Sequence, residues 1–196
     1  NNGDILSMAS SPSYDPNKFV KGISFSDYAS LKDDKKRPLA SKTVQDAYPP
    51  GSTFKMIVAL AALKEGIIST EDSIICKGHV EISDRKFHCW KSSGHGKVRL
   101  EKSITESCDV FYYDLALRLG IEKISEMAKI FGIGIKHNVP MSAETAGLAP
   151  TKRWKIDKRG KEWVIGDTVN AAIGQGDVLS SPLQLAVMSA RLATGL

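Results

Sequence analysis

The sequence has few cysteines and no long hydrophobic run. Its three cysteines are an odd number among 196 residues, so a secreted disulfide framework does not account for all of them. No apolar run approaches the ~20 residues that a membrane helix needs. The chain opens with neither a signal segment nor an initiator methionine. We therefore expect a mature or excised piece whose N-terminal membrane anchor has been left out.

The rest of the composition is that of a globular protein. Hydrophobic residues make up 42% and charged residues 25% of the chain, which argues against wholesale disorder. A chain of this length buries roughly 70% of the surface that its unfolded form exposes. A hydrophobic core can therefore form without disulfide bonds or metal ions. The net charge of +5 is mild, and only residues 152–161 form a tight basic cluster. We therefore expect no nucleic-acid partner.

Short extended segments and loops are expected in three regions. Residues 3–10 are apolar and bounded by turn residues, which predicts a strand, and the prolines that follow predict a loop over 11–18. Residues 74–97 are rich in glycine, histidine and short β-prone runs, so we expect small strands and tight turns. Residues 140–166 are polar, which indicates an irregular excursion.

Helical patterns cover more of the chain than extended ones. Residues 52–65 predict a helix that is apolar nearly all round, which is typical of a buried central helix. We expect further helices over 100–119 and 121–131, separated by Gly120, and a last helix from Pro182 to about residue 194.

The start of the first long helix pairs a hydroxyl with an amine. Ser52 and Lys55 are three residues apart, so they share one helix face. A serine at a helix N-terminus can use free N–H groups to stabilise an oxyanion, and an adjacent neutral lysine can serve as its base. Ser-x-x-Lys is a weak pattern, with a second match from Ser83 to Lys86. The preceding Pro-Pro-Gly and the buried helix favour the first match.

A second short motif lies 55 residues further along, at an expected helix–helix junction. Ser107, Cys108 and Asp109 follow one another there, and Ser107 could relay a proton between Lys55 and a leaving amine. Ser-x-Asp alone is also weak, because residues 13–15 match it. The two motifs in this order and at this separation are much less often accidental.

Together these segments resemble a penicillin-binding protein transpeptidase domain over residues 3–196. The resemblance rests on Tyr-Pro-Pro-Gly-Ser-Thr-Phe-Lys at 48–55, Ser-Cys-Asp at 107–109 and Asn-Ala-Ala-Ile-Gly-Gln-Gly at 170–176. The stretches 90–96 and 166–168 bring it closest to penicillin-binding protein 2, the class B group of the cell-elongation machinery. It implies an α+β fold of the penicillin-binding protein and serine β-lactamase type.

The resemblance also implies an activity, a location and partners. Ser52 would be the acylated nucleophile, Lys55 its base and Ser107 a proton shuttle, while Asp109 would hold the substrate amide. The reaction would be D,D-transpeptidation of peptidoglycan stem peptides ending in D-Ala-D-Ala, with β-lactams acylating the same serine. The protein would work at the periplasmic face of the inner membrane, with a RodA-type glycosyltransferase and MreC.

Two departures from the family pattern matter. The family often has asparagine where this chain has Asp109, and an ionised carboxylate can only accept hydrogen bonds. The family's third motif, Lys-Ser/Thr-Gly, is absent from the sequence. It would supply a cation for the substrate carboxylate and the second oxyanion N–H. We therefore expect residues 1–196 to be a partial transpeptidase domain, without anchor, pedestal or the later strands of the central sheet. Such a fragment would acylate weakly or not at all.

All three cysteines fall within a short region with a histidine. Cys76, Cys89, His95 and Cys108 fit a tetrahedral structural Zn²⁺ site. His95 is favoured over His79 and His88 because flanking glycines can turn its ring inward. The alternatives are a Cys76–Cys89 disulfide with a free Cys108, or three buried thiols. A metal bond to Cys108 would fix the loop that carries the second motif.

Other functions remain open from the sequence. A class D-like serine β-lactamase or β-lactam sensor also uses Ser-Thr-Phe-Lys, but its second motif normally ends in an apolar residue, unlike Asp109. A zinc-stabilised binding module without catalysis is the remaining alternative. The three tryptophans, Trp90 among them, are interpreted mainly as packing and rim residues.

Overall fold

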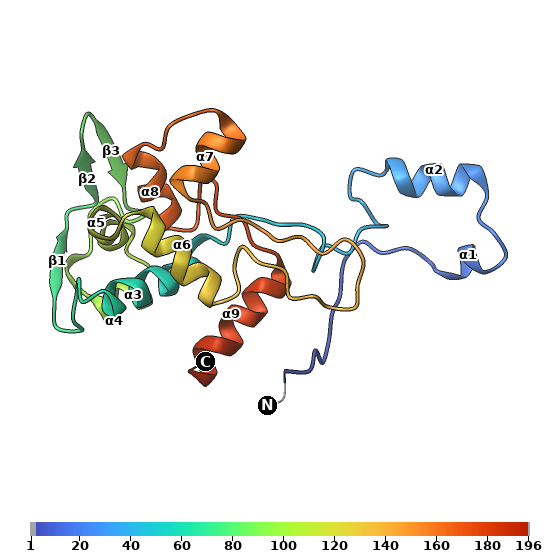
Figure 1. Ribbon diagram of the computed structural model, residues 1–196, viewed down its shortest axis with the longest axis horizontal. Helices are drawn as coiled ribbons and strands as arrows, with labels where there is room; N and C mark the ends of the chain where they lie inside the picture. The colour runs from blue at the N-terminus through green and yellow to red at the C-terminus, as the bar shows by residue number, and fades with distance from the viewer. Residues whose placement is uncertain (1–2, 196) are drawn as a thin grey trace.

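The computed structural model describes residues 3–195, which form a helical body and a projecting arm (Figure 1). The arm carries two short helices, α1 (Asn17–Val20) and α2 (Phe25–Asp33). It leaves large side chains in solvent, with Leu6 96% and Phe25 97% exposed. Within the described residues, no helix combines the length and apolarity needed to cross a membrane.

The strand predicted over residues 3–10 is wrong, since no residue of that segment lies in a strand. The physical reason is that a strand needs a hydrogen-bonded neighbour, and none of the described residues supplies one. The arm is instead tied down by side chains. Ser10 Oγ accepts from the Lys42 backbone N–H at 3.1 Å, and Lys42 Nζ donates to the Pro12 carbonyl at 3.4 Å.

The buried central helix is confirmed, with a different start. A 3₁₀ turn, η1 (Gly51–Phe54), leads directly into α3 (Lys55–Lys64). Most of α3 is buried, and it contacts α5 (Asp109–Leu119) and α6 (Ile121–Ile130). Ser52 therefore lies in the tight turn and Lys55 at the first position of the α-helix.

Small strands form two separate antiparallel pairs, as the sequence indicated. β1 (Ser73–Cys76) pairs with β4 (Gly96–Arg99), so that Cys76 lies opposite Gly96. β2 (His79–Ile82) and β3 (Arg85–His88) form a hairpin at one edge of the body (Figure 1).

The helical segment predicted over 100–119 is divided in two at the helix–helix junction expected for the second motif. α4 (Leu100–Thr105) ends before Ser107, and α5 starts at Asp109. Ser107 has φ +51°, a left-handed conformation that a continuing α-helix does not allow. Because of this break, Ser107 and Cys108 lie in the connection between α4 and α5. The expectation for 121–131 is confirmed by α6.

The C-terminal third contains two helices that the sequence analysis missed. Residues 140–151 are irregular as expected, but α7 (Lys152–Arg159) lies inside the predicted excursion. α8 (Ile165–Ala172) follows it. α9 (Pro182–Thr194) matches the prediction, and Ser181 and Gln184 form a reciprocal capping box at its start. The described residues thus combine helices with small strands, as expected for an α+β chain.

Candidate active site

Ser52 lies exposed in the turn at the mouth of the buried helix. The backbone of Gly174 holds that turn from behind, because the Gly51 N–H donates to the Gly174 carbonyl at 2.9 Å. A Cβ at Gly174 would lie 2.2 Å from the Gly51 carbonyl oxygen. Only glycine permits this approach, so the 170–176 stretch positions the turn that presents Ser52.

Lys55 is buried, 2% exposed, and its amine has three acceptors. Nζ donates to the Ser107 carbonyl at 2.9 Å, to Ser107 Oγ at 2.9 Å and to Asp109 Oδ1 at 2.6 Å. It also lies 5.5 Å from the ring centroid of Tyr112. Burial raises the pKa of Tyr112 to about 12, so the ring under the amine stays a neutral phenol. These three contacts are as many hydrogen bonds as a lysine amine can donate.

Ser107 connects Lys55 to Ser52. Its Oγ accepts from Lys55 and donates to Ser52 Oγ at 2.9 Å. Among the described residues no hydrogen bond joins Lys55 Nζ directly to Ser52 Oγ. The three side chains therefore form a relay in the order lysine, second serine, first serine.

Asp109 is held from two sides. Besides the ion pair with Lys55, its Oδ2 accepts from the Trp90 backbone N–H at 2.9 Å. Both carboxylate oxygens are thus engaged within the chain. The same tryptophan donates from Nε1 to the carbonyls of Glu106 at 3.0 Å and Ser107 at 3.1 Å. Trp90 therefore clamps the second-motif loop, a contact that the rim interpretation missed, although its place directly after Cys89 was a signal.

The four predicted metal ligands converge. Donor atoms of Cys76, Cys89, His95 and Cys108 lie within 4.8 Å of one another, all four side chains are buried, and the cysteines are free of disulfides. His95 Nδ1 lies 3.6 Å from Cys76 Sγ and 3.5 Å from Cys89 Sγ. Zinc bonds of about 2.3 Å to sulfur and about 2.0 Å to nitrogen place these atoms about 3.5 Å apart in a tetrahedron.

Two further observations fit a metal at this cluster. His95 Nε2 is buried without a hydrogen-bond partner among the described residues, and the nearest carboxylate, that of Glu106, lies 3.8 Å away. A ligating imidazole usually donates its second ring N–H to a carboxylate or carbonyl, and the Glu106 carboxylate lies just beyond hydrogen-bond distance of this nitrogen. Burial raises the pKa of the Cys108 thiol to about 12 in the metal-free chain, with the neighbouring sulfurs adding to the shift. A metal ion that binds Cys108 would therefore have to displace the proton of this thiol.

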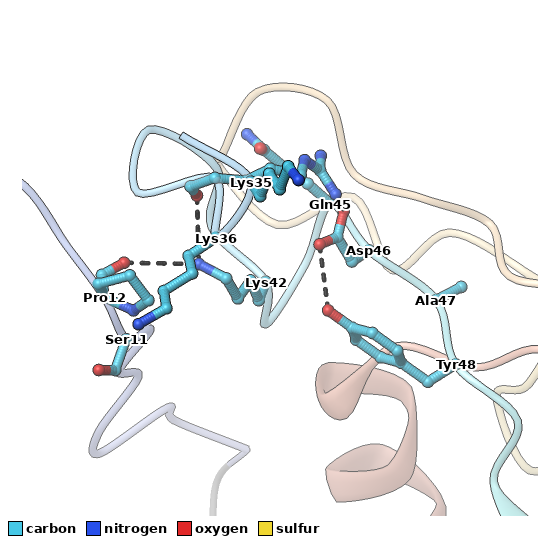
Figure 2. Close-up of a pocket in the computed structure, with 10 residues that line it drawn as sticks. Ser11, Pro12, Lys35, Lys36, Lys42, Gln45, Asp46, Ala47 and Tyr48 are labelled. Atoms are coloured by element: carbon cyan, nitrogen blue, oxygen red, sulfur yellow. Dashed lines mark hydrogen bonds and ion pairs between the residues drawn. The ribbon is translucent and has the colours of Figure 1, made fainter. Parts of the chain in front are cut away.

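A basic depression of about 540 Å³ lies at the junction of the arm and the body (Figure 2). Lys42 and Arg37 are among its cationic lining residues. Lys42 Nζ is already engaged by the carbonyls of Pro12 and Arg37 (Figure 2). Asp46 accepts from Arg37 at 2.7 Å and from the Tyr48 hydroxyl at 3.1 Å. The depression therefore joins the arm to the segment that leads to Ser52.

Comparisons with known proteins agree with the geometry of this site. The family model of the penicillin binding protein transpeptidase domain matches residues 1–195. The chain belongs to the penicillin-binding protein transpeptidase family. Among curated relatives of this family, it is 42% identical over 190 residues to the peptidoglycan D,D-transpeptidase MrdA of Acinetobacter baumannii. The match covers 96% of this chain and 28% of that relative.

Solved transpeptidase structures share the fold. The chain superimposes with a TM-score of 0.92 on Pseudomonas aeruginosa PBP2 in complex with WCK 5153, at 43% identity. That match covers 97% of this chain and 44% of the other. PBP2 in the complex with MreC from Helicobacter pylori also gives a TM-score of 0.92, at 38% identity, covering 95% and 35%. The chain thus spans less than half the length of each of these three relatives.

Proposed function

We propose that the chain provides the acylation machinery of a peptidoglycan D,D-transpeptidase, with Ser52 as the nucleophile. The observation that supports it most is the continuous hydrogen-bonded relay from Lys55 through Ser107 to Ser52. A serine hydroxyl is a weak nucleophile and needs a route by which its proton can leave. Membership of the transpeptidase family points to the same reaction class.

In the proposed acylation, Ser52 transfers its proton to Ser107 Oγ while Ser107 passes its own proton to a neutral Lys55 amine. The Ser52 oxygen bonds to the carbonyl carbon of the penultimate D-alanine. The bond to the terminal D-alanine then breaks, and the proton returns from Lys55 through Ser107 to the leaving amine. An amine from a neighbouring strand attacks the ester, which forms the cross-link and restores the Ser52 hydroxyl.

The absent Lys-Ser/Thr-Gly motif limits what the chain does by itself. An oxyanion hole needs two donors, and one missing donor costs about 10²–10³ in rate. Asp109 accepts one bond at each carboxylate oxygen within the described residues, so it retains the capacity to accept a substrate N–H beside Lys55 and Trp90. We propose that the fragment acylates weakly or not at all until a strand with the third motif is present.

Fluorescent penicillin labelling tests the proposal. A full-length protein that carries the third motif should form a stable adduct, and Ser52→Ala should abolish it. Thr53→Ala is the matched control, because within the described residues the exposed Thr53 hydroxyl donates to the Pro50 carbonyl at 2.8 Å and to no other group. Labelling that survives Ser52→Ala rejects the assignment, and rapid penicillin turnover instead of a stable adduct indicates a β-lactamase.

We further propose that Zn²⁺ occupies the cluster of Cys76, Cys89, His95 and Cys108 as a structural ion. The donor set, the burial and the spacing between sulfur and nitrogen atoms support it. The ion would neutralise the thiolates and fix β1, β4 and the second-motif loop relative to one another. It would take no part in the reaction, because all four ligand positions are filled by side chains.

Partners and location are proposed from the relatives. We propose that the full protein acts at the periplasmic face of the inner membrane with a RodA-type glycosyltransferase and MreC. The solved PBP2–MreC complex from Helicobacter pylori supports the MreC part. Co-purification of the membrane-anchored protein with MreC tests it, and its failure with folded, penicillin-reactive protein rejects this partner.

A further inference from the structure

Two histidines face each other on the hairpin of β2 and β3, away from the active site. His79 and His88 are directly opposite in the register. The next pair, Gly78 and Cys89, is hydrogen-bonded, with the Cys89 N–H donating to the Gly78 carbonyl at 2.8 Å. Because bonded and non-bonded pairs alternate, the histidines form a non-bonded pair, in which side chains approach most closely.

The strand alternation sets the two faces of this hairpin. Ile82 is buried and Phe87 contacts the Tyr113 ring with centroids 5.8 Å apart, so this face packs on the body. The imidazoles of His79 and His88 lie on the opposite face, with ring centroids 6.0 Å apart. Within the described residues neither ring makes a hydrogen bond or ion pair, unlike His95 and His137. The pair has no structural partner to explain it.

An oxygen donor lies beside the pair on the same outer face. Glu81 is two residues from His79, so it points to the same side of the sheet. Among the described residues its one ion pair is with Lys86 at 3.2 Å, and both side chains are more than half exposed. Exposed pairs of this kind contribute little, so the carboxylate can exchange this partner for a cation.

We propose that His79 and His88 form a second, solvent-facing metal site, with Glu81 as a supplementary oxygen ligand. Two imidazoles and a carboxylate select borderline transition metals such as Zn²⁺, Ni²⁺ and Cu²⁺ over Mg²⁺ or Ca²⁺. Small rotations of these accessible side chains bring the two ring nitrogens onto one ion. The site is separate from the buried cluster, because adjacent residues such as His88 and Cys89 point to opposite faces of the strand.

A bound ion would link β2 to β3 at the hairpin end next to Cys76 and Cys89. It would therefore stabilise the hairpin as well as bind. Losing one imidazole should weaken binding about a hundredfold, since the second ligand of a chelating pair acts at a high effective concentration.

The test uses the chain first given one equivalent of Zn²⁺ and then titrated with Ni²⁺. Binding is followed by calorimetry and by paramagnetic broadening of the histidine ring signals in NMR spectra. Ni²⁺ should broaden His79 and His88 together, and His79→Gln or His88→Gln should each remove this class of binding. Lys86→Gln is the matched control on the same face. It should keep or tighten binding, because it frees Glu81.

Two results overturn the proposal. One is Ni²⁺ affinity unchanged in both histidine variants, and the other is saturation without broadening of the two ring signals. Cys108→Ser separates this site from the buried cluster. It should remove the tightly held Zn²⁺ and leave the broadening of His79 and His88 unchanged.

Discussion

At the scale of single residues, Ser107 decides whether Lys55 can act on Ser52. Its hydroxyl is the only described bridge between them, at 2.9 Å on each side. We expect Ser107→Ala to lower the rate of acylation by fluorescent penicillin about 10²–10⁴-fold, the usual contribution of positioned proton transfer. The measurement requires the full-length protein with the third motif.

Thr105→Ala controls for changes near the same loop. In the part of the chain that the structure describes, the Thr105 hydroxyl hydrogen-bonds only to the carbonyls of Glu101 and Lys102, within its own helix. The Thr105→Ala variant should therefore be acylated at the same rate as the parent protein. A near-normal rate in Ser107→Ala would show instead that Lys55 reaches Ser52 directly or through water.

The ion pair of Lys55 and Asp109 is a stability element as well as a catalytic one. Their side chains are 3% and 14% exposed and lie 2.6 Å apart. We expect Lys55→Met to destabilise the fold by about 3–5 kcal/mol, because it leaves a partly buried carboxylate without its cation. Urea unfolding measures this. Adding Asp109→Asn should restore part of the loss, and strictly additive effects in the double variant would contradict the pairing.

At the scale of elements, the approach of Gly174 to the η1 turn gives a matched glycine comparison. Gly174 and Gly160 have φ of +69° and +62°, but only Gly174 has neighbours where a Cβ would lie. Gly160→Ala should cost about 1 kcal/mol from backbone strain alone. Gly174→Ala should cost about 1–3 kcal/mol more, from the clash with Gly51.

The rate of penicillin acylation is a second measurement that distinguishes Gly174→Ala from Gly160→Ala. Gly174→Ala should also slow penicillin acylation of the full-length protein, since Gly51 precedes the nucleophile. Gly160→Ala should leave the acylation rate unchanged. Equal stabilities for the two variants, measured by thermal unfolding, would mean that the turn yields to the added methyl group without cost.

The elements that the sequence predicted well are those with local signals. α9 begins with Ser181 and Pro182 and has an apolar pattern, so its bounds followed from the sequence. α7 is strongly basic and has no buried residue, which left no apolar stripe to read, although Thr151 caps its start. The strand over residues 3–10 failed because pairing depends on a neighbour, which local sequence does not specify.

At the scale of the whole molecule, the motifs predicted which residues gather but not how they connect. Ser52, Lys55, Ser107 and Asp109 meet as expected, yet the order of the relay depends on the left-handed φ of Ser107. That conformation separates the two helices at the expected junction, and it has no propensity signal. Trp90 then links this site to the cysteine cluster, its ring 5.4 Å from that of His95 by centroids. Such links between distant segments follow only from the assembled fold.

This connection predicts that metal removal affects the second motif as well as the cluster. Zinc bound only by the native state at a hundred times its Kd stabilises by about 2.7 kcal/mol, so chelation should lower the melting temperature. Hydrogen exchange at residues 107–109 should speed up, because Cys108 would no longer be fixed to the cluster. His79→Gln should not alter either change. A protein that contains no metal by elemental analysis, and melts identically with chelator, contradicts the structural zinc, since its buried thiols and His95 then hold the loop without a cation.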